Sequence, residues 1–321
     1  MFYMPSGFWK KNAKAALKNH WLTAILIALV VELPSLLVQG IGTITGNDLI
    51  GGVQNLVYTS MNADGTAIDT ERMIRGLQEL SGRTGIWVIQ GLRIAAWLMT
   101  PCLTMGMVAW MLGLLRKQPV GEVSAVFSRI GLFWKGIRLR LYVAWRIFVH
   151  MLPGFGVSLL SLLPLLLNRG NSSELSMMNA LNTAMGIQSA ATIASVVLGL
   201  AAALKYSLSD MVLADNPDMG PVTAAKESKR MTQGKKGQVF SLYISFVLWY
   251  LLQMLAVSMA YSMFGSVVSL MVEMLAALAI TVYLKTSVSA FYLGCRAMEG
   301  KEQRVSEEES WEETESQDEL N

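Results

Sequence analysis

Long apolar runs separated by short polar segments dominate the chain and predict six helices. A helix needs about 20 apolar residues to cross the ~30 Å hydrocarbon layer of a membrane. Because backbone N–H and C=O groups in lipid must be satisfied internally, such runs should form α-helices. We therefore expect an all-α, polytopic membrane protein with about six transmembrane helices, at residues 21–38, 86–115, 141–167, 187–213, 239–262 and 267–293.

Composition supports this class and excludes a soluble enzyme. Hydrophobic residues make up 53% of the chain and charged residues only 15%, against roughly 25% charged in soluble domains. Two cysteines and two histidines are too few for a disulfide framework, a Cys/His metal cluster or a histidine-based triad. Nucleotide loops, serine-hydrolase elbows and zinc-protease helices are also missing from the sequence. We expect no catalytic residues, no cofactor and no metal.

The distribution of lysine and arginine predicts the orientation of the spans. Basic residues gather in alternate connections, and such connections normally stay in the cytoplasm. Fifteen lie before the first span, between the second and third, and between the fourth and fifth. The opposite connections hold only Arg72, Arg75, Arg83 and Arg169. Both termini should therefore be cytoplasmic.

Each odd-numbered span follows a basic, partly amphipathic segment, at residues 8–20, 123–140 and 222–238. The chain thus reads as three helical hairpins, each preceded by a basic interfacial helix. The simplest interpretation is that these helices lie on a lipid bilayer with anionic headgroups. Binding of a protein partner or a nucleotide is the alternative.

Two outer loops and an acidic tail complete the organisation of a single transmembrane domain at residues 1–298. Outer loop 39–85 is rich in glycine and then predicts a helix that ends at Gly82, with Asp69 or Thr70 as its cap. Outer loop 168–186 has a similar pattern. We expect both helices to lie flat on the outer surface; the alternative is that they form a lid over a cavity.

Residues 299–321 hold ten acids against two basic residues. We expect a disordered cytoplasmic tail. Since the whole chain has a formal net charge of +3, the rest of it is strongly basic. The basic segments or the acidic tail could bind a protein partner, and no nucleic acid partner is expected.

The cytoplasmic elbow at residues 214–238 carries a distinctive pattern. It begins Asp215-Asn216-Pro217, and at fixed offsets the chain continues with Gly220, Ser228, Gly234, Lys236, Ser245 and Trp249. Together with the segment 14–21, this stretch resembles the bacterial integral membrane family catalogued as domain of unknown function 975. The resemblance covers residues 8–38 and 205–298. It implies a multi-pass fold in a bacterial plasma membrane, and it implies no activity.

A structural elbow accounts for this pattern. Pro217 ends the fourth span, and Asp215 or Asn216 can cap the next helix. Pro221 suits the first turn of that helix, and Gly234 its end. In the functional alternative, Asp215 and Asp218 face Lys226 or Arg230 and bind an ion or solute.

Ionisable residues inside the spans form two layers, and such residues normally face other helices or water. Glu32, Arg93 and Glu273 lie toward the outside. The inner layer is a candidate polar site made of Arg146, His150, Lys205, Asp210 and Lys285. Structural pairing would join Glu32 or Glu273 to Arg93, and Asp210 to Arg146 or Lys285; a polar conduit is the alternative.

Arg146 and His150 share a helix face at i, i+4 spacing. Pro153 and Gly154 should interrupt that helix just after them, as in the midplane sites of transporters.

The fourth span carries small residues at four-residue steps. Such a ladder allows another helix to approach closely. The sequence does not determine whether that helix belongs to this chain or to a second copy. The ladder consists of Ala191, Ser195, Gly199, Ala203 and Ser207.

Three functions are compatible with these features. The first is a non-catalytic membrane protein that binds or organises partners, favoured by the missing catalytic motifs and the charge asymmetry. The second is a small-solute transporter or permease that uses the inner polar layer. The third is a membrane-embedded lipid enzyme. We favour the first.

Overall fold

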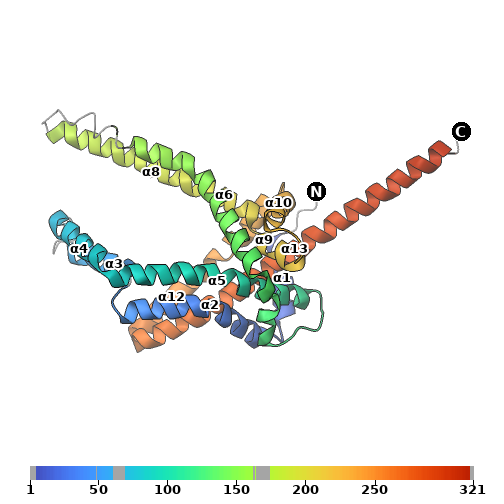
Figure 1. The fold of residues 1–321 in the computed structure, drawn as a ribbon, viewed down its shortest axis with the longest axis horizontal. Coiled ribbons are helices and arrows are strands. Elements are labelled where there is room, and N and C mark those ends of the chain that lie inside the picture. The colour runs from blue at the N-terminus through green and yellow to red at the C-terminus, as the bar shows by residue number, and fades with distance from the viewer. Residues whose placement is uncertain (1–4, 48, 61–68, 162, 164–173, 319–321) are drawn as a thin grey trace.

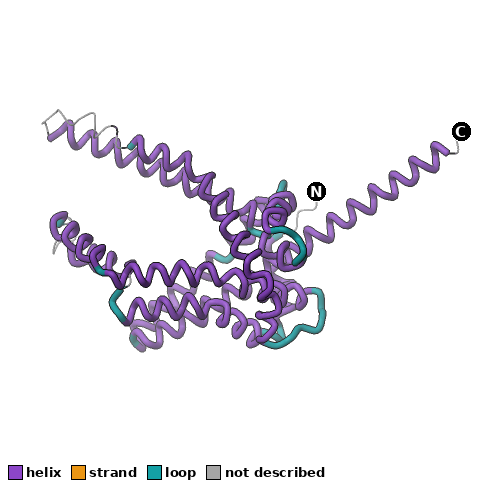
Figure 2. The backbone as a smooth tube through the Cα atoms, in the orientation of Figure 1, coloured by secondary structure: helices purple, strands orange, loops and turns teal. Residues whose placement is uncertain are grey.

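The computed structural model describes residues 5–47, 49–60, 69–161, 163 and 174–318, and every element in this part of the chain is a helix (Figures 1 and 2). One of them, η1, is a 3₁₀ helix. The elements are α1 (Ser6–Leu17), α2 (Trp21–Ile44), α3 (Leu49–Ser60), α4 (Thr70–Gly82), α5 (Thr84–Leu115), η1 (Val123–Leu132), α6 (Phe133–Leu160), α8 (Glu174–Tyr206), α9 (Ser209–Asp215), α10 (Pro221–Met231), α11 (Lys236–Ile244), α12 (Val247–Phe264) and α13 (Ser266–Asp318).

Six helical stretches of the described chain are long and apolar enough to cross a membrane, as the sequence predicted. The fold is therefore all-α and compatible with a multi-pass membrane protein. Three of the stretches bend between two elements: the third comprises η1 and α6, the fourth α8 and α9, and the fifth α11 and α12. Local bends of this kind leave mean hydropathy unchanged, which is why the pattern did not predict them.

Helices of consecutive spans lie side by side, α2 with α5, α6 with α8, and α12 with α13. In Figure 1 the pair α6 and α8 diverges from the group formed by α2, α5, α12 and α13. Helices α1, α9 and α10 lie where these two groups join, at the end of the molecule that holds both termini. Helices α3 and α4 lie at the opposite end.

The core is deepest around α9, between the two groups of helices. Leu208, Met211 and Leu213 are almost fully buried, in a cluster that also contains Phe291 and Tyr292 of α13. A second cluster joins α2, α5 and α13. Between membrane helices, van der Waals packing of this kind is a main source of association, so the junction around α9 joins the two groups of helices.

Pro34, Pro101 and Pro153 lie inside α2, α5 and α6 without ending them. Pro101 has no N–H, so the carbonyl of Trp97 loses its helical partner. Arg140 of α6 donates a hydrogen bond to that carbonyl at 2.9 Å. The predicted interruption at Pro153 is wrong: α6 continues through it to Leu160. Next to Pro153, Gly154 lies directly against Ser195 of α8.

Outside the spans, the structure confirms one predicted helix and differs elsewhere. Helix α4 begins after Asp69, whose side chain accepts a hydrogen bond from the Arg72 N–H at 3.0 Å. The glycine-rich part of loop 39–85 contains the unpredicted helix α3. In the second outer loop, α8 starts at Glu174 and continues into the fourth span; residues 164–173 lie outside the described residues.

The acidic segment after residue 298 is helical to Asp318, where the sequence predicted disorder. Glutamate, lysine, glutamine and arginine are good helix formers. Extension of a helix that is already packed needs no new nucleation. Composition alone therefore favoured disorder, whereas the continuation of α13 favours a helix.

Candidate functional site

Asp215, at the end of α9, is the centre of a polar network that joins three helices. Arg116, just after α5, donates two hydrogen bonds to its carboxylate, at 2.7 and 2.9 Å. The Tyr292 hydroxyl of α13 donates a third, at 2.8 Å, and Arg296 lies 3.9 Å away. Only 9% of the Asp215 side chain is exposed. The hydrogen bond that Arg116 donates to Asp215 raises the pKa of the Arg116 guanidinium above its usual value. The network joins α5, α9 and α13.

The functional alternative, in which Asp215 and Asp218 face Lys226 or Arg230, is wrong for Asp215, which pairs with Arg116. Arg230 instead donates to Glu227 of its own helix, at 2.6 and 3.0 Å, and lies 3.2 Å from Glu299. The hydrogen bond from Arg230 lowers the pKa of Glu227, against the opposing effect of burial. Asp218 is exposed. The elbow therefore does not form the proposed ion site.

Ser228 of α10 stabilises the bend between α8 and α9. Its hydroxyl accepts a hydrogen bond from the Leu208 N–H at 3.2 Å and donates to the Lys205 carbonyl at 3.1 Å. Thr232 donates to the same carbonyl at 3.2 Å. Groups at a helix end need such partners when they are buried. Ser228 is fully buried, and its role in the elbow is therefore structural.

Other residues of the elbow also have structural roles. Pro217 accepts a hydrogen bond from Lys135 through its carbonyl, at 2.6 Å. The side-chain carbonyl of Asn216 accepts one from Arg296 at 3.4 Å. Gly220 precedes α10, whose first residue is proline as predicted. Gly234 has a φ of 74° in the turn before α11, a conformation that glycine adopts without strain.

The last part of the family pattern contacts α1 and α13. Lys236 is exposed at the start of α11. Lys10 of α1 donates a hydrogen bond to the Ser245 carbonyl at 3.1 Å, where the chain bends between α11 and α12. Burial lowers the pKa of Lys10. The ring of Trp249 lies 6.2 Å from that of Tyr283.

Three of the five residues of the inner polar layer meet between α6 and α8. The Lys205 ammonium lies 3.2 Å from Nε2 of His150, and Nδ1 of His150 lies 2.6 Å from the Arg146 carbonyl oxygen. Asp210 is on α9 and Lys285 on α13. Among the described residues, no ion pair joins Asp210 to Arg146 or Lys285. The structure therefore separates the acid from the basic cluster.

The small-residue ladder of α8 faces two neighbours within the chain. Ala191, Ser195 and Gly199 are buried. Ser195 lies against Gly154 of α6, and Gly199 lies against Met151. Ala203 and Ser207 instead line an apolar groove of about 490 Å³, together with residues of α11 and α12.

Leucine at the ladder should force α6 and α8 apart. A Cβ on Gly199 already meets Met151 atoms at 3.1 Å, so Gly199→Leu should cost about 1–3 kcal/mol of overpacking. Thermal unfolding in mild detergent measures this cost. Gly186→Leu, on the same helix, is the matched control, because a Cβ added to Gly186 would meet nothing within 4 Å. Equal melting temperatures for the two variants would contradict the packing role.

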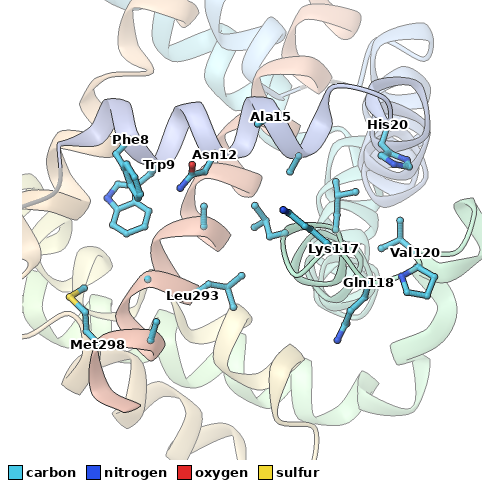
Figure 3. Close-up of a pocket in the computed structure, with 17 residues that line it drawn as sticks. Phe8, Trp9, Asn12, Ala15, His20, Lys117, Gln118, Val120, Leu293 and Met298 are labelled. Carbon is cyan, nitrogen blue, oxygen red and sulfur yellow. The ribbon is translucent and has the colours of Figure 1, made fainter. Parts of the chain in front are cut away.

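A cavity that the sequence did not indicate lies between α1, the end of α5 and α13 (Figure 3). Its volume is about 1030 Å³. Phe8 and Leu293 are among its apolar lining residues, and Asn12, His20 and Lys117 are among the polar ones. Lys117 has a φ of 56°, in the left-handed region that sequence patterns assign to glycine. The described residues contain no cluster of three metal-ligating side chains.

Comparison with known proteins finds one family. A family model described as "Protein of unknown function (DUF975)" matches residues 4–299. This match includes the middle of the chain, which the resemblance in sequence did not cover. No curated protein and no solved structure matches.

Proposed function

Because the chain belongs to the DUF975 family, whose function is unknown, we propose from its geometry a role as a non-catalytic membrane protein that organises partners at one membrane face. In this proposal the end with both termini faces the cytoplasm of a bacterial cell. Helices α1 and α10, with Lys236 at the start of α11, then form the basic interfacial layer at the membrane surface.

The observation that carries this proposal is the separation of charge at that end. Seven exposed lysines lie on α1, α10, α11 and the connections after α1 and α5, and no ion pair within the described residues involves them. They are Lys11, Lys14, Lys18, Lys117, Lys226, Lys229 and Lys236. The acidic end of α13 projects away from the rest of the molecule (Figure 1). One face thus offers a basic surface and an acidic helix to binding partners.

The polar network of the elbow supports this role rather than catalysis. Asp215, Ser228 and Thr232 use their hydrogen bonds to join helices. The transport alternative uses the inner polar layer and a break at Pro153, and of these two features the break is missing, because α6 is continuous there. The basic side chains left exposed are therefore the groups available for binding.

Native mass spectrometry of the full chain, extracted from its own membrane in mild detergent, tests the proposal. We expect a stoichiometric protein partner. A chain that ends at Gly300 should lose this partner if the partner binds the acidic end of α13. If the partner binds the basic surface, the double variant Lys226→Gln, Lys229→Gln should bind it at least tenfold more weakly. Arg72→Gln with Arg75→Gln, at the opposite end, is the matched control. A subunit without any protein partner, or equal binding in all variants, would contradict the proposal.

A further inference from the structure

The hydrogen bonds of His150 determine its proton position. A carbonyl oxygen can only accept, so the 2.6 Å contact with the Arg146 carbonyl means that Nδ1 of His150 carries the proton and donates it. Nε2 then has a free lone pair, which accepts a hydrogen bond from the Lys205 ammonium at 3.2 Å. In this arrangement His150 holds Lys205 in place through Nε2.

Two positive side chains of the facing helices, Arg146 of α6 and Lys205 of α8, have no acidic counterpart among the described residues. Arg146 donates from Nε to the Tyr206 hydroxyl at 3.2 Å. Within the described residues, its two terminal nitrogens have no hydrogen-bond partner, and neither Arg146 nor Lys205 forms an ion pair with an acid. Both side chains are half-buried. Like charges beside apolar helices are costly unless an anion or water compensates them.

The cluster lies at the level where the spans meet the elbow, rather than midway along them. Lys205 accepts hydrogen bonds from Ser228 and Thr232 through its own carbonyl, so α10 touches the same turn of α8. Helix α10 is polar and carries exposed lysines. If the elbow lies at the membrane surface, the cluster is at the depth of the lipid headgroups.

An exposed aromatic stripe begins beside the cluster. Trp145 precedes Arg146 in α6 and is 62% exposed. Its ring lies 5.9 Å from that of Phe148, which in turn lies 6.2 Å from that of Phe155. Tryptophan is enriched at membrane interfaces. Cationic donors followed by an apolar stripe match the order of groups in an anionic lipid.

We propose that Arg146 and Lys205 bind a phosphate group, that His150 is a positioning residue for Lys205, and that the phosphate belongs to an anionic lipid. Guanidinium and ammonium groups are the usual partners of phosphate oxygens. The acyl chains would lie along Trp145, Phe148 and Phe155. This lipid site is additional to the partner-binding role and does not depend on it.

Titration of the delipidated full chain with single lipids, read by native mass spectrometry in a neutral detergent, tests the site. We expect phosphatidylglycerol to bind at least tenfold more tightly than phosphatidylcholine. Arg146→Gln and Lys205→Gln should each remove this preference, whereas Lys205→Arg, which keeps the positive charge, should retain it. Lys285→Gln, which removes another charge within a span, is the matched control and should retain the preference. Thermal unfolding in the same detergent identifies any variant that does not fold.

Inorganic phosphate separates the two sources of the anion. Competition by millimolar phosphate, without a preference between the lipids, would support the anion site and overturn its lipid assignment. Equal binding of both lipids without any effect of phosphate would overturn the whole proposal. The same loss in Lys285→Gln as in Lys205→Gln would also overturn it, because the effect would then follow net charge alone.

Discussion

The Gly106→Ala variant should fail to reach the native fold. Gly106 of α5 lies directly against the backbone of Val126 in η1, so a Cβ would overlap the carbonyl of Val126. A backbone segment cannot move aside as the end of a side chain can. We expect a loss of at least ~3 kcal/mol, the upper end of typical overpacking costs. The yield of monodisperse protein and its thermal unfolding in mild detergent measure the effect.

Gly91→Ala provides the control on the same helix. Nothing lies within 4 Å of a Cβ at that position. Because alanine has a higher helix propensity than glycine, Gly91→Ala should leave stability unchanged or raise it by up to ~1 kcal/mol. A well-folded Gly106→Ala variant with the melting temperature of Gly91→Ala would show that η1 does not pack on α5 as described.

The second large effect is expected from Asp215→Ala. This change leaves Arg116 and Tyr292 without their shared acceptor at a largely buried point. Breaking a fully buried ion pair costs roughly 3–5 kcal/mol. Because the Arg116 side chain is 38% exposed, water compensates part of this loss, and we expect about 2–3 kcal/mol. Thermal unfolding of the full chain in detergent measures it.

Asp218→Ala separates this effect from a general loss of acidic charge. Asp218 is exposed in the connection that follows α9, and its replacement should change stability by less than ~0.5 kcal/mol. A double-mutant cycle of Asp215→Ala with Arg116→Ala then measures the coupling between these two residues, which should be about 0.5–3 kcal/mol for residues in contact. Additive effects of the two single changes would contradict the network at Asp215.

The elbow shows how much of the candidate site could be predicted from sequence. Its pattern marked Asp215, Ser228 and Gly234 as special, and the rule for proline placed the start of α10 correctly, while Gly234 lies in the turn just after its end. The partners of Asp215 were not predictable. Arg116 is 99 residues away along the chain and Tyr292 is 77, and local spacing carries no information on such contacts.

The basic cluster gives the same lesson within the spans. Spacing placed Arg146 and His150 on one helix face, because the period of a helix is fixed. Their neighbour turned out to be Lys205, whereas charge matching had favoured Asp210. Opposite charges are only one influence on how helices pack; small residues also let α8 lie close against α6, with Gly199 against Met151 and Ser195 against Gly154.

The sequence by itself determined the helical class and the six apolar stretches, because hydrophobicity and helical period are properties of neighbouring residues. It also determined the family, through residues at fixed offsets. Only the tertiary structure decided that α6 continues through Pro153, that Asp215 joins α5 to α13, and that α1 lines an open cavity with α5 and α13. These features depend on contacts between segments far apart in the chain, where packing and the satisfaction of buried polar groups outweigh local preference.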